Sequence, residues 1–112
     1  MQALPSGKRL ESERYALVFR TQPAAVVVGS HFAVEFSVCP KGDAPAPQSV
    51  RIDAHMPAHR HGMNYAPQIA RTTEGRYLAT GLMFHMPGRW EFVFDLRAGD
   101  KTDRLSESVT LE

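Results

Sequence analysis

Residues 89–97 read RWEFVFDLR, a run in which large apolar side chains alternate with polar ones. In an extended chain one face of this run carries four apolar residues, namely Trp90, Phe92, Phe94 and Leu96. The other face carries polar residues, among them Glu91, Asp95 and Arg97. Because successive side chains of a β-strand point to opposite faces, the run predicts a strand with one face in a hydrophobic core and the other in water.

Alternation of the same kind recurs along the chain, and turn-forming Gly, Pro and Asp residues separate the runs. The pattern predicts strands at residues 14–20, 24–28, 31–39, 49–56, 65–73, 76–84, 89–97 and 104–111. Capped segments with helical periodicity are missing, which argues against an α/β fold. We therefore expect an all-β protein, an immunoglobulin-like antiparallel β-sandwich of seven to eight strands.

The length of 112 residues suits one domain, which we place at residues 13–112 after an N-terminal tail at 1–12. The net charge is +1, from 13 basic and 12 acidic residues scattered along the chain, so a nucleic-acid partner is not expected. No apolar run approaches the roughly 20 residues of a membrane-spanning helix. Residues 1–7 also lack the charged-then-apolar order of a signal peptide.

Motifs for catalysis are missing from the sequence. It contains no G-x-S-x-G nucleophile motif and no glycine-rich phosphate loop. Cys39, the only cysteine, lies in the apolar run 32–39, where we expect a small buried residue without a reactive thiol. An internal disulfide is thereby excluded. We do not expect the domain to be an enzyme.

Histidine and methionine residues concentrate in two segments. Residues 55–63 read HMPAHRHGM, and residues 83–88 read MFHMPG. Both segments follow predicted strands, so they can meet at one end of the sandwich. The residues that we expect to bind a metal ion there are His59, His61, Met63 and His85, with Met86 as a fifth candidate. Thioether sulfur is a soft ligand that zinc, magnesium and calcium seldom take, so the set favours copper as Cu(I), and imidazole also tolerates Cu(II).

Other interpretations of these residues stay open. By strand alternation Met56 and Met86 fall on the core side, where methionine commonly serves only to fill space. His55 points outward with Arg51 and can be merely solvated. His31 is far along the chain from both segments, and we expect a surface residue.

The segments 56–63, MPAHRHGM, and 75–92, GRYLATGLMFHMPGRWEF, resemble the YtkA-like domain family. The resemblance covers roughly residues 13–112. Its pattern falls on Met56, Pro57, His61, Gly62, Met63, Met86, Pro87, Gly88 and Trp90. The resemblance implies an immunoglobulin-like domain related in shape to FixH-type and CopC-type copper proteins. It also implies a periplasmic domain, or one anchored to the membrane and facing the periplasm, whose signal or anchor lies outside this sequence.

These observations together predict a periplasmic copper-binding protein, a carrier or chaperone with one ion at one pole of the sandwich. Its expected partners are the metal ion and a copper-receiving or envelope membrane protein, and copper could also bridge two copies into a homodimer. The alternative is a non-metal interaction module of the bacterial envelope that uses a Met/His-rich contact surface.

Overall fold

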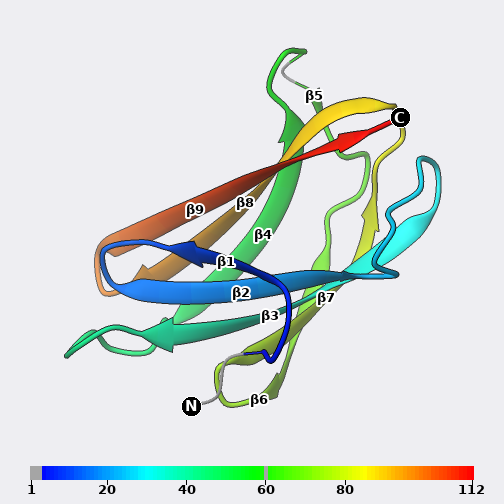
Figure 1. The fold of residues 1–112 in the computed structure, drawn as a ribbon. Coiled ribbons are helices and arrows are strands. Elements are labelled where there is room, and N and C mark those ends of the chain that lie inside the picture. Colours follow the sequence, from blue (N-terminus) through cyan, green and yellow to red (C-terminus); the bar gives the residue numbers. More distant parts are fainter. Residues whose placement is uncertain (1–3, 60) are drawn as a thin grey trace.

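Two antiparallel sheets form a sandwich in the computed structural model, which describes residues 4–59 and 61–112 (Figure 1). The strands are β1 (Lys8–Glu11), β2 (Tyr15–Gln22), β3 (His31–Pro40), β4 (Ser49–Met56), β5 (His61–Gly62), β6 (Gln68–Thr73), β7 (Arg76–Met83), β8 (Gly88–Ala98) and β9 (Lys101–Leu111). One sheet has the order β1-β2-β3-β7-β6 and the other β5-β4-β8-β9. The predicted all-β sandwich is confirmed, with nine strands in the described residues. These residues include no helix of the length and apolar character needed to cross a membrane.

The predicted strand at 24–28 is wrong, because this segment forms bends and a turn between β2 and β3. Pro23 at its start has no backbone N–H to donate to a sheet. Val26 and Val28 nevertheless pack against the core from the loop. The backbone N–H of Gly29 then donates to the carbonyl oxygen of Phe84 at 2.9 Å. The apolar alternation in this segment therefore reflects a loop that packs on the core.

Two short strands lie outside the predicted set. β1, within the stretch expected as a tail, pairs with β2 in the register Lys8↔Phe19 to Glu11↔Ala16. β5 has only two residues and pairs with the end of β4. Neither strand shows an apolar alternation of its own. Both are therefore held by the neighbouring strand.

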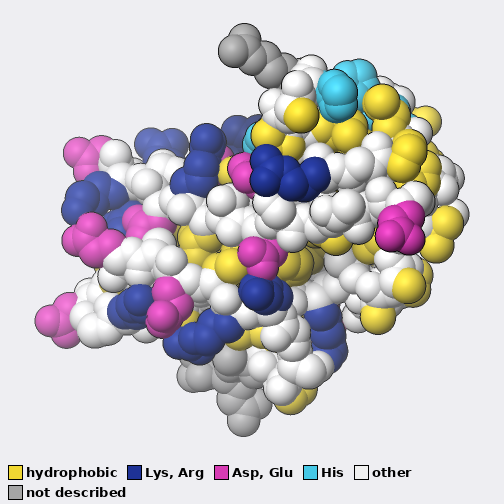
Figure 2. Space-filling view, turned by 45° about the horizontal axis from the view of Figure 1, so that its top comes forward, with side chains coloured by type: hydrophobic (Ala, Val, Ile, Leu, Met, Phe, Trp, Pro, Cys, Tyr) yellow, Lys and Arg dark blue, Asp and Glu magenta, His cyan; other side chains and the backbone are white. Residues whose placement is uncertain are grey.

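The two ends of the sandwich differ in character. Four strand ends lie together at one pole. In one sheet β3 begins where β7 ends, because His31 pairs with Met83. In the other sheet β8 begins where β4 ends, because His55 pairs with Glu91. Figure 2 shows histidine side chains beside hydrophobic ones toward this end, on the right, while Lys, Arg, Asp and Glu dominate the other end. We call the first end the His/Met pole.

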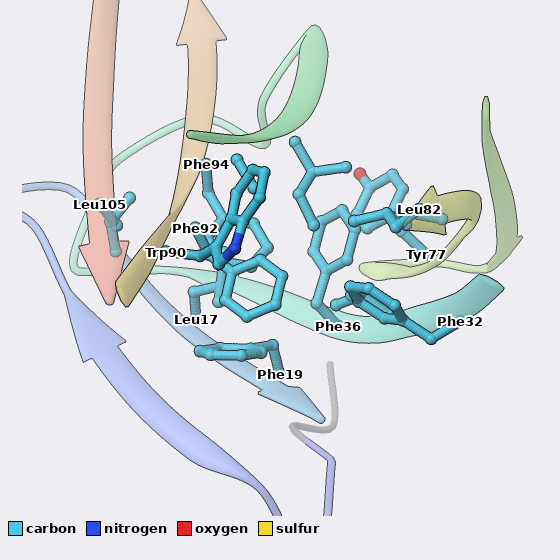
Figure 3. Packing of buried hydrophobic residues seen from close by; sticks show 14 of the residues in the cluster. Leu17, Phe19, Phe32, Phe36, Tyr77, Leu82, Trp90, Phe92, Phe94 and Leu105 are labelled. Atoms are coloured by element: carbon cyan, nitrogen blue, oxygen red, sulfur yellow. The ribbon is translucent and has the colours of Figure 1, made fainter. Parts of the chain in front are cut away.

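Aromatic side chains from both sheets fill the core (Figure 3). The ring of Phe19 from β2 lies 5.4 Å from that of Phe92 and 5.2 Å from that of Phe94, both on β8. Trp90, Phe92, Phe94 and Leu96 are all buried, as their alternation predicts. Cys39 is a free cysteine and is half-buried, so the expectation that it is buried is wrong.

A hydrogen-bonded carboxylate fastens the opposite end of the sandwich. Asp103 accepts hydrogen bonds from the Ser12 hydroxyl at 2.6 Å and from the Arg14 side-chain Nε at 2.8 Å. It also accepts one from the Arg14 backbone N–H at 3.1 Å. Burial acts to raise the pKa of Asp103, but the hydrogen bonds from Ser12 and Arg14 outweigh it and hold the pKa below its ordinary value. The ionised carboxylate therefore links the turn before β2 to β9.

We expect Asp103→Asn to lower the free energy of unfolding at neutral pH, and the loss to shrink in acid. A carboxylate whose pKa is depressed by folding stabilises the protein above its unfolded pKa, and this contribution disappears as the pH falls through the folded value. The difference between wild type and variant should hold above about pH 5 and narrow below about pH 4. Urea unfolding of both proteins from pH 7 to pH 2.5 measures it. A difference that stays constant over this range would contradict the role of the ionised group.

Candidate metal centre

Two of the predicted ligands meet at the His/Met pole. The Nε2 atoms of His61 and His85 lie 2.6 Å apart, and their ring centroids are 4.7 Å apart. His61 comes from β5, whereas His85 lies in the turn between β7 and β8. The prediction that the 55–63 and 83–88 segments come together is therefore confirmed for these two side chains.

The backbone explains how His61 reaches this position. In the β4–β5 pair His61 lies opposite Met56, and His55 lies opposite Gly62. Residues directly opposite in an antiparallel pair project on the same face of the sheet. Met56 points into the sandwich and is 2% exposed, so His61 lies on the interior side of the sheet at its open end.

Aromatic packing positions His85. The ring of its neighbour Phe84 stacks on Trp90 with centroids 4.5 Å apart and an angle of 12°. The His85 ring meets the same Trp90 edge-on at 5.5 Å. The Trp90 indole N–H donates to the carbonyl oxygen of Met86 at 3.0 Å, which fixes the backbone on the other side of His85. The imidazole is therefore held from below by a fully buried residue.

The nitrogen pair has a chemistry that a lone surface histidine lacks. Two imidazole nitrogens at 2.6 Å cannot both carry a proton, so at least one presents a lone pair toward the other. Two nitrogens bound tetrahedrally to one ion at 2.0–2.1 Å would lie about 3.3 Å apart. A small separation of the rings, with His61 exposed, would admit such an ion between them.

The second ring nitrogen of His85 is also notable. Its Nδ1 is buried and has no hydrogen-bond partner among the described residues. A buried polar atom without a partner costs about 1–3 kcal/mol. This nitrogen lies on the opposite edge of the ring from Nε2, so Nε2 is the atom that faces His61.

The two segments that carry the pair contain four methionines, which differ in exposure. Met56 is buried, Met63 is half-buried and packs against the core, Met83 is half-buried, and Met86 is 37% exposed. The expectation that Met86 falls on the core side is wrong, because β7 ends at Met83 and strand alternation no longer applies in the turn. The role of Met63 and Met86 as ligands stays a prediction.

The remaining histidines lie outside the close pair. His59 is exposed on the turn that leaves β4, where its backbone N–H donates to the Met56 carbonyl oxygen at 3.2 Å. His55 lies on the outer face, with its Nε2 3.8 Å from a carboxylate oxygen of Glu91. The role of His59 as a ligand stays a prediction.

His31 is exposed, as expected, but the fold brings it to the His/Met pole. It pairs with Met83, and its ring lies 5.4 Å from that of Tyr65. No local pattern in the sequence indicates this, because the position depends on β3 pairing with β7 across more than 50 residues of chain. Sequence reasoning therefore misses His31 as a residue of this pole.

Among residues 4–59 and 61–112, no group of three or more His, Cys, Asp or Glu side chains could hold a metal ion. A site built on His61 and His85 thus needs further donors of another kind, and thioether sulfur is the kind that this pole offers.

The pole also carries exposed apolar side chains. The large exposed hydrophobic residues of the described chain are Val27, Tyr65 and Met86. Val27 lies in the loop that hydrogen-bonds to Phe84, Tyr65 contacts His31, and Met86 follows His85. The two imidazoles therefore lie within an apolar surface, which agrees with the view in Figure 2.

Comparison with known proteins gives one match. The model of the YtkA-like family matches residues 9–94, a range that includes both His/Met segments. No curated protein and no solved structure matches the chain. Since the family match spans well over half of the sequence, this chain belongs to the YtkA-like family.

Proposed function

We propose that this domain is a periplasmic copper carrier that binds one ion at the His/Met pole. The observation that carries the proposal is the contact between the Nε2 atoms of His61 and His85 at 2.6 Å, because it joins two segments 24 residues apart through two metal-binding atoms. Periplasmic location, or a membrane anchor facing the periplasm, follows from the family resemblance and belongs to the proposal.

The donor chemistry favours copper over other ions. Imidazole alone suits zinc, copper, iron and nickel, whereas thioether sulfur selects Cu(I). Methionines 56, 63 and 86 lie on the same segments as the imidazole pair. A mixed set of this kind holds Cu(I) best and still accommodates Cu(II).

The exposure of the site favours a carrier over a structural metal centre. His61 is exposed, and His85 is half-buried. A structural site is closed around its metal, whereas transfer requires that incoming ligands reach the ion. We expect the recipient to be a copper-receiving protein of the envelope.

Copper titration is the direct test of this function. We expect the purified domain to bind one equivalent of Cu(I) in competition with a chromophoric chelator, and more weakly one of Cu(II). Binding to the folded state should raise the free energy of unfolding by about 2.7 kcal/mol when free copper is about 100 times the dissociation constant. Absence of stoichiometric binding and an unchanged melting temperature would refute the proposal.

Substitution of the pair should remove binding without loss of the fold. We expect His61→Ala and His85→Ala each to weaken copper binding by at least about 10- to 100-fold, since each removes a ligand. His55→Ala is the matched control, because His55 lies at the end of β4 next to β5 but on the outer face of the sheet, beside Glu91. The far-ultraviolet circular dichroism should stay that of the wild type. Equal affinity in the wild type and the His61 variant would exclude this site.

The apolar side chains of the pole support a second candidate function. Val27 is 58% exposed and Tyr65 is 52% exposed, and large apolar surface near polar groups commonly marks a protein contact site. On this alternative the domain is a non-metal interaction module that docks an envelope protein. A flat copper titration, together with partner binding that Tyr65→Ser weakens, would select it.

A further inference from the structure

The structure fixes both the backbone and the terminal methyl group of Met56 relative to the two histidines. Its backbone lies opposite His61 in the β4–β5 pair, so the two side chains share a face. Directly opposite residues have Cβ atoms about 4.5–5.5 Å apart. The Met56 side chain therefore starts beside His61.

The far end of the Met56 side chain reaches the segment that carries His85. A Cβ atom built on Gly88 would lie 2.7 Å from the Met56 methyl carbon Cε, so this methyl occupies the space that any side chain at 88 would need. Gly88 begins β8 three residues after His85 and has a φ of 128°. The absence of a side chain at 88 thus makes room for Met56 next to the turn.

Burial distinguishes Met56 from the other methionines that the structure describes. It is 2% exposed, whereas Met63 and Met83 are half-buried and Met86 is 37% exposed. A buried methionine has already lost its rotamer freedom on folding, so it pays little additional entropy when it binds an ion. An exposed methionine pays that cost at binding.

We propose that Met56 supplies the thioether ligand of a copper site completed by His61 and His85, an inference that rests on the copper-binding function proposed above. The thioether enters from the core side, beneath the two imidazoles. Because this sulfur is soft, it favours Cu(I) over Cu(II) and makes Met56 the residue that sets the preferred oxidation state.

The test compares Met56→Leu with Met63→Leu and Met86→Leu, all close in volume to the wild type. On this inference Met56 takes the place of the predicted ligands Met63 and Met86, so we expect Met56→Leu alone to lower the Cu(I) affinity, by about 10- to 100-fold, and to leave the Cu(II) affinity within about threefold. X-ray absorption of the Cu(I)-loaded proteins should show one sulfur scatterer in the wild type. That scatterer should disappear in Met56→Leu and persist in the other two variants.

A second measurement uses the wild-type protein, so its result does not depend on whether Met56→Leu, a substitution in the core, folds. In protein labelled with carbon-13 at the methionine methyl groups, Cu(I) should shift the Met56 signal more than those of Met63 and Met86. A sulfur scatterer retained in Met56→Leu, or a larger shift of Met63 or Met86, would overturn the inference while copper binding itself stands. Absence of copper binding by the wild type would overturn both proposals.

Discussion

The stacking of Phe84 on Trp90 joins the core of this protein to the candidate site at its surface. Trp90 is fully buried at the start of β8, and Phe84 follows the end of β7. Their rings lie nearly parallel at 4.5 Å, so the turn between the two strands is anchored at both sides. His85 is adjacent to one partner and contacts the other edge-on. Aromatic packing in the core therefore gives the His85 imidazole a defined position. The 2.6 Å contact with His61 depends on that position.

The two histidines differ in how firmly the structure holds them. His85 rests on Trp90, and the backbone beyond it is held by the hydrogen bond from the indole N–H to the Met86 carbonyl. His61 lies on a two-residue strand that pairs only with the last two residues of β4. Short pairing of this kind opens more readily than a long strand in a sheet. One imidazole is thus fixed and the other can move, an arrangement that would suit the loading and release of an ion by the proposed copper carrier.

Much of the fold follows from the sequence, because its strong signals are local. The alternation in 89–97 predicts both the strand and its buried face, and the four apolar residues of that face, at 90, 92, 94 and 96, are all buried. The failures have physical causes. The apolar residues at 24–28 pack on the core from a loop, and the alternation cannot distinguish the two cases. β5 exists because β4 offers it an edge, so its two residues contain no strand signal of their own.

The candidate site, like the fold, is predicted in part from local sequence and in part depends on strand pairing. Clustering of histidine and methionine in 55–63 and 83–88 is visible in the sequence and predicts that the two segments can meet. That His61 is the residue beside His85 depends on the pairing of β5 with β4. The position of Met56 is different. Alternation correctly assigns it to the core and thereby suggests simple packing, whereas its register opposite His61 and its contact above Gly88 depend on strand pairing in three dimensions. A side chain at the last inward-facing position of a strand can be buried in the core and also lie next to a site at the rim of the sandwich, because the core ends at that position.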